Sequence, residues 1–271
     1  MAALPDFHER YVVPRAAIDT FAANGHAMLR GLASVAEVAS WRPLLVAAAE
    51  EYRWDKRPLA ERETYGKAFM QAANLWQRDA RLAPFALARR FAGAAAALLC
   101  VDAVRIYHDQ ALFKEPGGGY TPWHQDQTYW PLDTDRTITM WMPLVDVPAA
   151  VGTMHFVSGS HRCGDLDVAG ISDRTEAHFQ ELIAQRQWPV HTYGALRAGD
   201  ATFHGGWTLH GAAANPTLLM REVMTIIYFA DGTRVAPVRH KAQAHDLRAW
   251  LPGCAPGDLA ATPINPRIEP A

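Results

Sequence analysis

The chain has 271 residues, with 26 basic and 28 acidic side chains and a formal net charge of −2. Apolar residues make up 49% and charged residues 20%, a balance typical of a globular protein with a sizeable core. This composition excludes a disordered chain and gives no support for nucleic-acid binding through bulk positive charge.

The longest apolar run, Phe91 to Val101, is shorter than the about 20 residues needed to cross a bilayer. The beginning of the sequence mixes charged residues and has no apolar signal-peptide core. We therefore expect a cytoplasmic protein that associates with neither membrane nor nucleic acid.

The first hundred residues predict mainly helices. Pro14 is suited to open a short helix that Asn24 and Gly25 close, since glycine readily takes the left-handed conformation after a helix end. A further helix is expected over 84–99.

Another helix is expected to begin after Ser34 and to run towards Tyr52. Ser34 and Glu37 have the spacing of a capping box, in which each residue satisfies a backbone N–H of the other. Proline lacks a backbone N–H, so we expect Pro43 to break this helix early.

From about residue 101 to 229 the segments are short, rich in β-branched and aromatic residues, and punctuated by glycine and proline. Residues 137–145 fit a strand in which Thr139 and Trp141 face one side and Met140 the other. Residues 222–229 predict another strand. Residues 175–187 predict a helical insertion.

Helices followed by many short strands predict an all-β core with helical cladding. The length from 101 to 230 suits a double-sheet jelly roll of about eight strands, the cupin-like double-stranded β-helix. We expect one domain over 1–271, with cladding at 1–100, the jelly roll at 101–230 and a tail at 231–271. The tail holds six of the 18 prolines, which indicates loop-rich packing or a lid.

Three cysteines, Cys100, Cys163 and Cys254, are too few and too widely spaced for a disulfide framework or a thiolate zinc site. Histidine is in excess instead, with 12 residues. Because histidine is the commonest transition-metal ligand, the spacing of the histidines is informative.

The strongest site signal is formed by His124 and Asp126. On a strand, residues two apart point to the same face, so the imidazole and the carboxylate are expected to converge. His210 follows later, with Arg221 eleven residues beyond it. Two histidines and one carboxylate make the facial triad of non-haem Fe(II) oxygenases, and an arginine nearby can hold a carboxylate through a bidentate fork.

At these residues the sequence resembles the phytanoyl-CoA dioxygenase family of Fe(II)- and 2-oxoglutarate-dependent oxygenases. The resemblance covers much of the chain and rests on segments in the family's order. They are 21–30, 111–119 leading into His124 and Asp126, 141–146, 152–161, and His210 with Arg221.

The resemblance implies that His124, Asp126 and His210 bind Fe(II) and that Arg221 pairs with the distal carboxylate of 2-oxoglutarate. O₂ would then convert 2-oxoglutarate to succinate and CO₂ while an unactivated C–H bond of the substrate is oxidised. Ascorbate is expected to stimulate turnover. A further polar contact to 2-oxoglutarate is expected from residues lining the site, for which the candidates are Gln110, Thr121, Trp141 and Thr153.

Asp126 also bears on the reaction. Related halogenases have a small residue in its place, which leaves room for chloride. Asp126 therefore favours hydroxylation, or another non-halogenating oxidation, over chlorination.

We expect a small-molecule substrate, most simply a secondary metabolite. The alternatives are an acyl-CoA hydroxylase of the same family, a zinc hydrolase with the same three ligands, and a non-catalytic cupin-like binding protein. The sequence does not name the substrate or the oligomeric state.

Several residues near the motif have a structural as well as a functional interpretation. His204 is expected mainly as a hydrogen-bonded residue at a hairpin, with a pocket role as the alternative. About half of the aromatic residues that flank the metal motif, among them Trp123, Tyr129 and Trp130, are expected to line a largely apolar pocket. Trp54 either closes this pocket or fills core.

Overall fold

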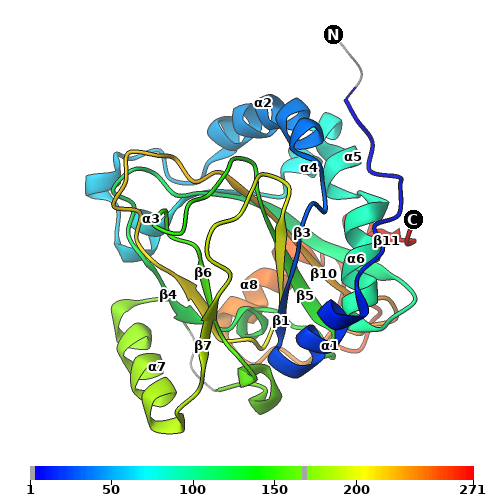
Figure 1. The fold of residues 1–271 in the computed structure, drawn as a ribbon. Helices are drawn as coiled ribbons and strands as arrows, with labels where there is room; N and C mark the ends of the chain where they lie inside the picture. Colours follow the sequence, from blue (N-terminus) through cyan, green and yellow to red (C-terminus); the bar gives the residue numbers. More distant parts are fainter. Residues whose placement is uncertain (1–3, 167–169) are drawn as a thin grey trace.

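The computed structural model describes residues 4–166 and 170–271, which form two antiparallel sheets clad by helices (Figure 1). The larger sheet runs in the order β1 (His26–Leu29), β8 (Ala201–Gly205), β5 (Thr137–Pro143), β10 (Val223–Ala230), β3 (Val104–Phe113) and β11 (Arg267–Ile268), and β2 (Met70–Ala73) also pairs with β3. The smaller sheet runs in the order β4 (Thr121–His124), β9 (His210–Ala212), β6 (Met154–Val157) and β7 (Val190–Thr192).

Both sheets contribute side chains to one cavity, which therefore lies between them. Within the described part of 101–230 there are eight strands, β3 to β10, as expected. The predicted double-stranded β-helix with helical cladding is confirmed.

Strand β5 shows how the alternation of side chains divides core from cavity. All seven of its residues are buried. Ile138, Met140 and Met142 pack into the main hydrophobic core. Thr139 and Trp141, which point the other way, line the cavity. This confirms the predicted faces of the strand.

The helices cover the outer surface of the sheets. In Figure 1, α1 (Arg15–Asn24) and α6 (Arg89–Leu99) lie over the larger sheet, whereas α7 (Asp173–Arg186) lies beside β4 of the smaller one. The other helices are α2 (Val35–Tyr52), α3 (Thr64–Ala68), α4 (Leu75–Arg78), α5 (Ala83–Ala86) and α8 (Lys241–Trp250), with the 3₁₀ turns η1 (Leu59–Glu61), η2 (Ala80–Leu82), η3 (Asp126–Tyr129) and η4 (Ser160–Cys163).

The expected helix ends are confirmed where a capping residue marks them. Gly25 closes α1 with a φ of 80°, and its N–H donates to the carbonyl of Phe21. Ser34 and Glu37 form the predicted capping box of α2. Helix α7 confirms the predicted insertion within one or two residues at each end.

The expectation that Pro43 breaks α2 is wrong. The helix continues to Tyr52 with Pro43 inside it. Proline removes one backbone hydrogen bond, that to the carbonyl of Ala39, and Ala39 is exposed, so water can serve that carbonyl. Burial of Trp41 and Leu45 on either side of the proline holds the helix in place.

The single helix expected over 84–99 is also wrong, because the chain forms α5 and α6 with a break at Leu87 and Ala88. Ala88 has an extended backbone (φ −57°, ψ 121°). The break allows residues of both helices to pack on one ring: the ring centroids of Phe85 and Phe91 lie 5.7 and 4.6 Å from that of Phe7. Tertiary packing thus overrides a continuous apolar pattern.

This region also contains one segment, Ala80–Leu99, that is long and apolar enough to cross a membrane by length and composition alone. Its most apolar window is 61% buried inside the protein. Core helices of globular proteins have the same properties, so the segment is weak evidence for a membrane span.

The tail is more ordered than expected. It contains α8 and β11, and α8 packs against η3 and is drawn near the centre of Figure 1, behind the strands. His240 caps α8 by accepting from the N–H of Gln243. The sequence predicts neither α8 nor β11, because the frequent prolines of the tail favour loops and the apolar pattern of α8 is short.

Candidate metal centre and oxygenase site

Three potential metal ligands converge where strand β4 ends and strand β9 begins. His124 ends β4 and His210 begins β9, and the two residues lie opposite each other in the antiparallel pair. His124 Nε2 lies 3.3 Å and His210 Nε2 3.6 Å from Asp126 Oδ1. One ligand atom from each of the three residues lies within 4.8 Å of the others, so a single ion can contact all three.

The local structure that brings Asp126 to the histidines differs from the expectation. The sequence predicts His124 and Asp126 on one face of a strand, but β4 ends at His124 and Asp126 begins η3. The extended Gln125 between them still turns the carboxylate back towards the imidazoles. The convergence is as expected, although its cause is a turn.

Both imidazoles are oriented by backbone carbonyl groups. His124 Nδ1 lies 2.7 Å from the carbonyl oxygen of Pro122, and His210 Nδ1 lies 2.9 Å from that of Thr208. A carbonyl oxygen only accepts, so each Nδ1 donates, and Nε2 is the ring nitrogen that faces Asp126. Two Nε2 atoms and a carboxylate oxygen therefore converge, and this set of ligand atoms fits a bound cation.

Two further residues hold the Asp126 carboxylate by its second oxygen. Thr139 Oγ1 donates to Oδ2 at 3.1 Å, and His204 Nε2 lies 3.3 Å from the same atom. Burial raises the pKa of Asp126, but the neighbouring imidazoles, His210 first, outweigh it and keep the pKa well below its ordinary value. The carboxylate therefore stays ionised, as a metal ligand requires.

Arg221 is fully buried beside the triad and lines the same cavity. Its Nη1 donates to the carbonyl of Gly152, its guanidinium carbon lies 5.3 Å from the Trp141 ring centroid, and its Nε has no partner. No carboxylate pairs with it within residues 4–166 and 170–271. Burial lowers its pKa to about 9, so this cation is prepared for an anion from outside the chain.

Lys114 is a second buried basic residue beside Arg221. It forms an isolated β-bridge with Arg221, and its Nζ donates to the carbonyl of Gly119. Burial and then the charge of Arg221 lower the pKa of Lys114 to about 6. Lys114 is thus a neutral donor near neutral pH and leaves Arg221 as the cation of this end.

The cavity has a volume of about 450 Å³ and extends from the triad to the protein surface. Its inner end is formed by the strands. Its outer part is largely aromatic and is lined by Trp54, Tyr65, Phe69, Gln71, Tyr129, Trp130, Ile171, His245, Asp246 and Trp250. We call these ten residues the outer wall.

The four candidates for a further 2-oxoglutarate contact are placed differently. Gln110, Thr121 and Trp141 line the cavity, and Gln110 accepts from the side-chain amide of Gln71. Thr153 is buried but is not among the lining residues, and its hydroxyl lies 3.5 Å from that of Thr192. The geometry thus leaves three of the four within reach of a ligand in the cavity.

The flanking residues divide much as alternation predicts. Tyr129 and Trp130 line the cavity, whereas Trp123 lies beside His155 at a separate hollow near α7. His204 was expected mainly as a structural residue at a hairpin. It lies instead on β8, lines the cavity and contacts Asp126.

Other residues of the site carry no signal in the sequence motif. Thr139 was placed on the correct strand face, but its bond to Asp126 depends on tertiary structure. Asp246 and Trp250 lie on α8, which was not predicted. Tyr65 belongs to a loop-rich region, residues 53–69, that joins α2 to β2. Trp54, from the same region, was expected either to close the pocket or to fill core; it lines the cavity and is 54% exposed, so it is not a core residue.

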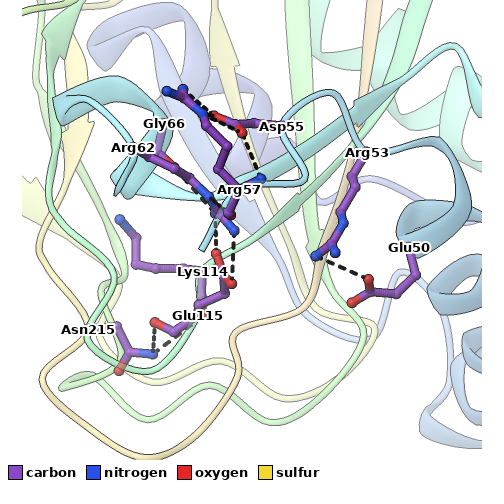
Figure 2. Close-up of polar contacts among 9 residues, drawn as sticks. All are labelled: Glu50, Arg53, Asp55, Arg57, Arg62, Gly66, Lys114, Glu115 and Asn215. Atoms are coloured by element: carbon purple, nitrogen blue, oxygen red, sulfur yellow. Dashed lines mark hydrogen bonds and ion pairs between the residues drawn. The ribbon is translucent and has the colours of Figure 1, made fainter. Parts of the chain in front are cut away.

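A polar network fixes this loop-rich region against the end of β3 (Figure 2). The guanidinium of Arg62, whose side chain is 2% exposed, forms an ion pair with Glu115 and donates to the carbonyl of Arg57 at 2.9 Å. Asn215 donates to the carbonyl of Glu115 at 3.1 Å. Because Lys114 precedes Glu115, the network connects the segment carrying Trp54 and Tyr65 with the strand that pairs with Arg221.

Two solved structures with the same architecture come from nogalamycin biosynthesis. The non-heme alpha ketoglutarate-dependent carbocyclase SnoK from nogalamycin biosynthesis is 26% identical, with a TM-score of 0.77 over 94% of this chain and 96% of that one. The epimerase SnoN, solved with Fe³⁺, alpha ketoglutarate and nogalamycin RO, is 25% identical, with a TM-score of 0.73 over 93% of this chain and 97% of that one.

A curated relative shares part of the sequence. The probable alpha-ketoglutarate-dependent hypophosphite dioxygenase of Stutzerimonas stutzeri is 28% identical over 133 residues, which are 47% of this chain and 46% of that protein. The match therefore spans about half the length of this relative.

A jelly roll that presents two histidines and one carboxylate to a cavity defines the class of non-haem metal oxygenase folds. The profile of the phytanoyl-CoA dioxygenase (PhyH) family matches residues 21–223, which include the triad and Arg221. The chain belongs to this family. Membership confirms the resemblance seen in the sequence and the expectation of Fe(II) and 2-oxoglutarate as cofactors.

Proposed function

We propose that this chain is an Fe(II)- and 2-oxoglutarate-dependent oxygenase that hydroxylates an unactivated C–H bond of a small molecule. The observation that carries the proposal is the buried, unpaired guanidinium of Arg221 in the same cavity as the His124–Asp126–His210 triad. A triad alone also suits a zinc hydrolase, but that reading gives Arg221 no task.

Each of these residues has a defined role in the proposal. His124, Asp126 and His210 would hold the metal, each through one ligand atom. Arg221 binds the distal carboxylate of 2-oxoglutarate, and its free Nε is available for that bond. Gln110, Thr121 and Trp141 line the space where the co-substrate would lie.

When bound, iron and 2-oxoglutarate supply the oxidising power, as one oxygen atom of O₂ enters succinate with loss of CO₂ and the other enters the substrate. The protein orients the substrate C–H bond and keeps water away. The aromatic outer wall suits both tasks, because it offers apolar contact around a few polar groups.

Hydroxylation, or another non-halogenating oxidation, is favoured over chlorination because Asp126 would fill the coordination position that halogenases leave to chloride. The similar structures are described as a carbocyclase and an epimerase from nogalamycin biosynthesis, which supports a secondary-metabolite substrate. An acyl-CoA substrate is less well supported, because Arg221 is the one Lys or Arg side chain among the described lining residues and it is committed to 2-oxoglutarate.

The test is succinate formation from 2-oxoglutarate by the purified protein with Fe(II), ascorbate and O₂, first alone and then with a panel of small molecules. We expect succinate above an iron-free control, rising with a substrate, and none from Asp126→Ala. Absence of succinate under every condition, with zinc bound to the purified protein, would favour a hydrolase or a binding protein instead.

A further inference from the structure

Asp246 stands out among the residues of the outer wall. It lies on α8 and its carboxylate lines the cavity. It accepts hydrogen bonds from Tyr107 Oη, at 3.4 Å, and from the side chain of Trp250, but no Lys or Arg pairs with it in the described ranges 4–166 and 170–271. Burial raises its pKa to about 7, which is the behaviour of a carboxylate that lacks a compensating cation.

With Fe(II) and 2-oxoglutarate bound, Asp246 would be the one charged side chain of the described cavity lining without an opposite charge. Fe(II) would carry two positive charges and 2-oxoglutarate two negative ones, and Asp126 and Arg221 would balance each other. Of the Asp, Glu, Lys and Arg side chains among the described residues lining the cavity, only Asp246 then remains. A substrate with one positive charge would complete the balance.

The surroundings of Asp246 also suit a cation. Trp250 and Tyr65 line the same region, and Trp250 packs on His108 with ring centroids 4.5 Å apart. The partly exposed Trp54 lies at the outer edge. Aromatic faces attract ammonium groups, and the attraction grows when water is excluded.

Helix α8 holds the carboxylate in a fixed place relative to the metal site. Gln243 is buried and donates to the carbonyl of Thr128 at 3.1 Å. Thr128 belongs to η3, the turn that begins with Asp126. A hydrogen bond therefore joins α8, which carries Asp246, to η3, which carries the metal ligand Asp126. A substrate cation bound at Asp246 would thus have its remaining atoms at a fixed distance from the metal site.

We infer that the substrate carries a basic nitrogen, whose ammonium group pairs with Asp246 among the aromatic side chains while its C–H bond faces the metal. This inference rests on the proposed function and names its substrate class. It assigns Asp246 as a specificity-determining residue and α8 as the element that selects the substrate.

The test compares amines with alcohols of the same carbon skeleton. The probes are 2-phenylethylamine, 3-phenylpropylamine and 4-phenylbutylamine, each beside the corresponding alcohol. Binding is measured by tryptophan fluorescence with the anaerobic Fe(II)–2-oxoglutarate protein. The variants are Asp246→Asn and, as a matched control that removes the same charge from the exposed surface of α1, Asp19→Asn.

We expect at least one amine to bind about tenfold more tightly than its alcohol, the preference falling to near unity in Asp246→Asn and persisting in Asp19→Asn. Equal binding of every pair, no binding of any amine, or an unchanged preference in Asp246→Asn would overturn the inference. An unchanged preference in Asp246→Asn would mean that the amine binds elsewhere in the cavity.

A separate readout distinguishes failure of the inference from failure of the proposed function. The visible charge-transfer absorption of the iron–2-oxoglutarate complex reports cofactor binding without any substrate. We expect this band in the wild type and in Asp246→Asn. If the wild type lacks the band, the proposed function fails, and the amine preference still decides whether Asp246 binds a cation.

Discussion

The two ends of the cavity are built in different ways. The inner end comes from paired strands of the jelly roll, where His124 and His210 lie opposite each other and every ligand is held by a second group. The outer wall comes largely from the loop-rich region 53–69 and from α8, which lie outside the eight jelly-roll strands. Under the proposed function, the two sheets would bind the metal and 2-oxoglutarate, whereas region 53–69 and α8 would select the substrate.

The strongest test of the inner end is removal of the carboxylate ligand. Loss of a group that supports a metal ligand costs roughly 10–100-fold in affinity or activity, and loss of the ligand itself should cost more. We expect Asp126→Ala to abolish succinate formation and stoichiometric iron binding, as measured by metal analysis after dialysis. Full iron content and activity in this variant would remove Asp126 from the triad.

The next largest effect is expected at Arg221. Arg221→Met keeps much of the side-chain volume against Trp141 but removes the charge. We expect the KM for 2-oxoglutarate to rise about 100-fold, the cost of losing one partner of a buried ion pair, with less change in iron binding. In addition, 2-oxoglutarate should raise the Tm of the wild type but not of this variant. An unchanged KM would assign the carboxylate to another group.

The outer wall is tested by the Arg62–Glu115 ion pair. Arg62→Met leaves Glu115 without its partner and loosens the segment that carries Trp54 and Tyr65. We expect a loss of about 2 kcal/mol in the free energy of unfolding, below the value for fully buried pairs because Glu115 is partly exposed. Urea unfolding measures this loss.

The matched control for Arg62 is Arg81→Met, which breaks an ion pair with Asp79 whose arginine side chain is 72% exposed. Its effect should stay within about 0.5 kcal/mol. Iron binding should be normal in both variants. A loss of iron in Arg62→Met alone would show that the two ends of the cavity are not independent.

The smallest effect is expected at Thr139, which positions Asp126 without touching the metal. Thr139→Val keeps the shape but removes the hydrogen bond to Oδ2. We expect iron affinity to fall about tenfold, by metal titration, and Thr139→Ser to restore most of it. Equal affinities in the three proteins would mean that His204 alone orients the carboxylate.

The sequence predicts the inner end better than the outer wall for a physical reason. Metal ligands need particular side chains at short or strand-related spacings, so His124, Asp126, His210 and Arg221 form a pattern that can be read without a structure. Even there, the prediction of one strand carrying both His124 and Asp126 was wrong, because a turn satisfies the same convergence.

The outer wall depends on contacts between distant segments. Nothing near Asp246 in the sequence indicates that it lines the same cavity as Tyr65, and the prolines around α8 obscure its helical pattern. The division at Ala88 has the same origin, since only packing on Phe7 explains it. The roles of the site residues, the single domain and the cytoplasmic location stay predictions.

The position of α8 has a consequence for engineering. The family profile ends at residue 223, and α8 begins at Lys241, so this part of the cavity lies beyond the shared segment. A graft that replaces 240–251 with the corresponding residues of a relative would exchange Asp246 and Trp250 while leaving the triad and Arg221 untouched. Helix α8 is therefore a segment that can be exchanged as a unit to change which compounds the protein accepts.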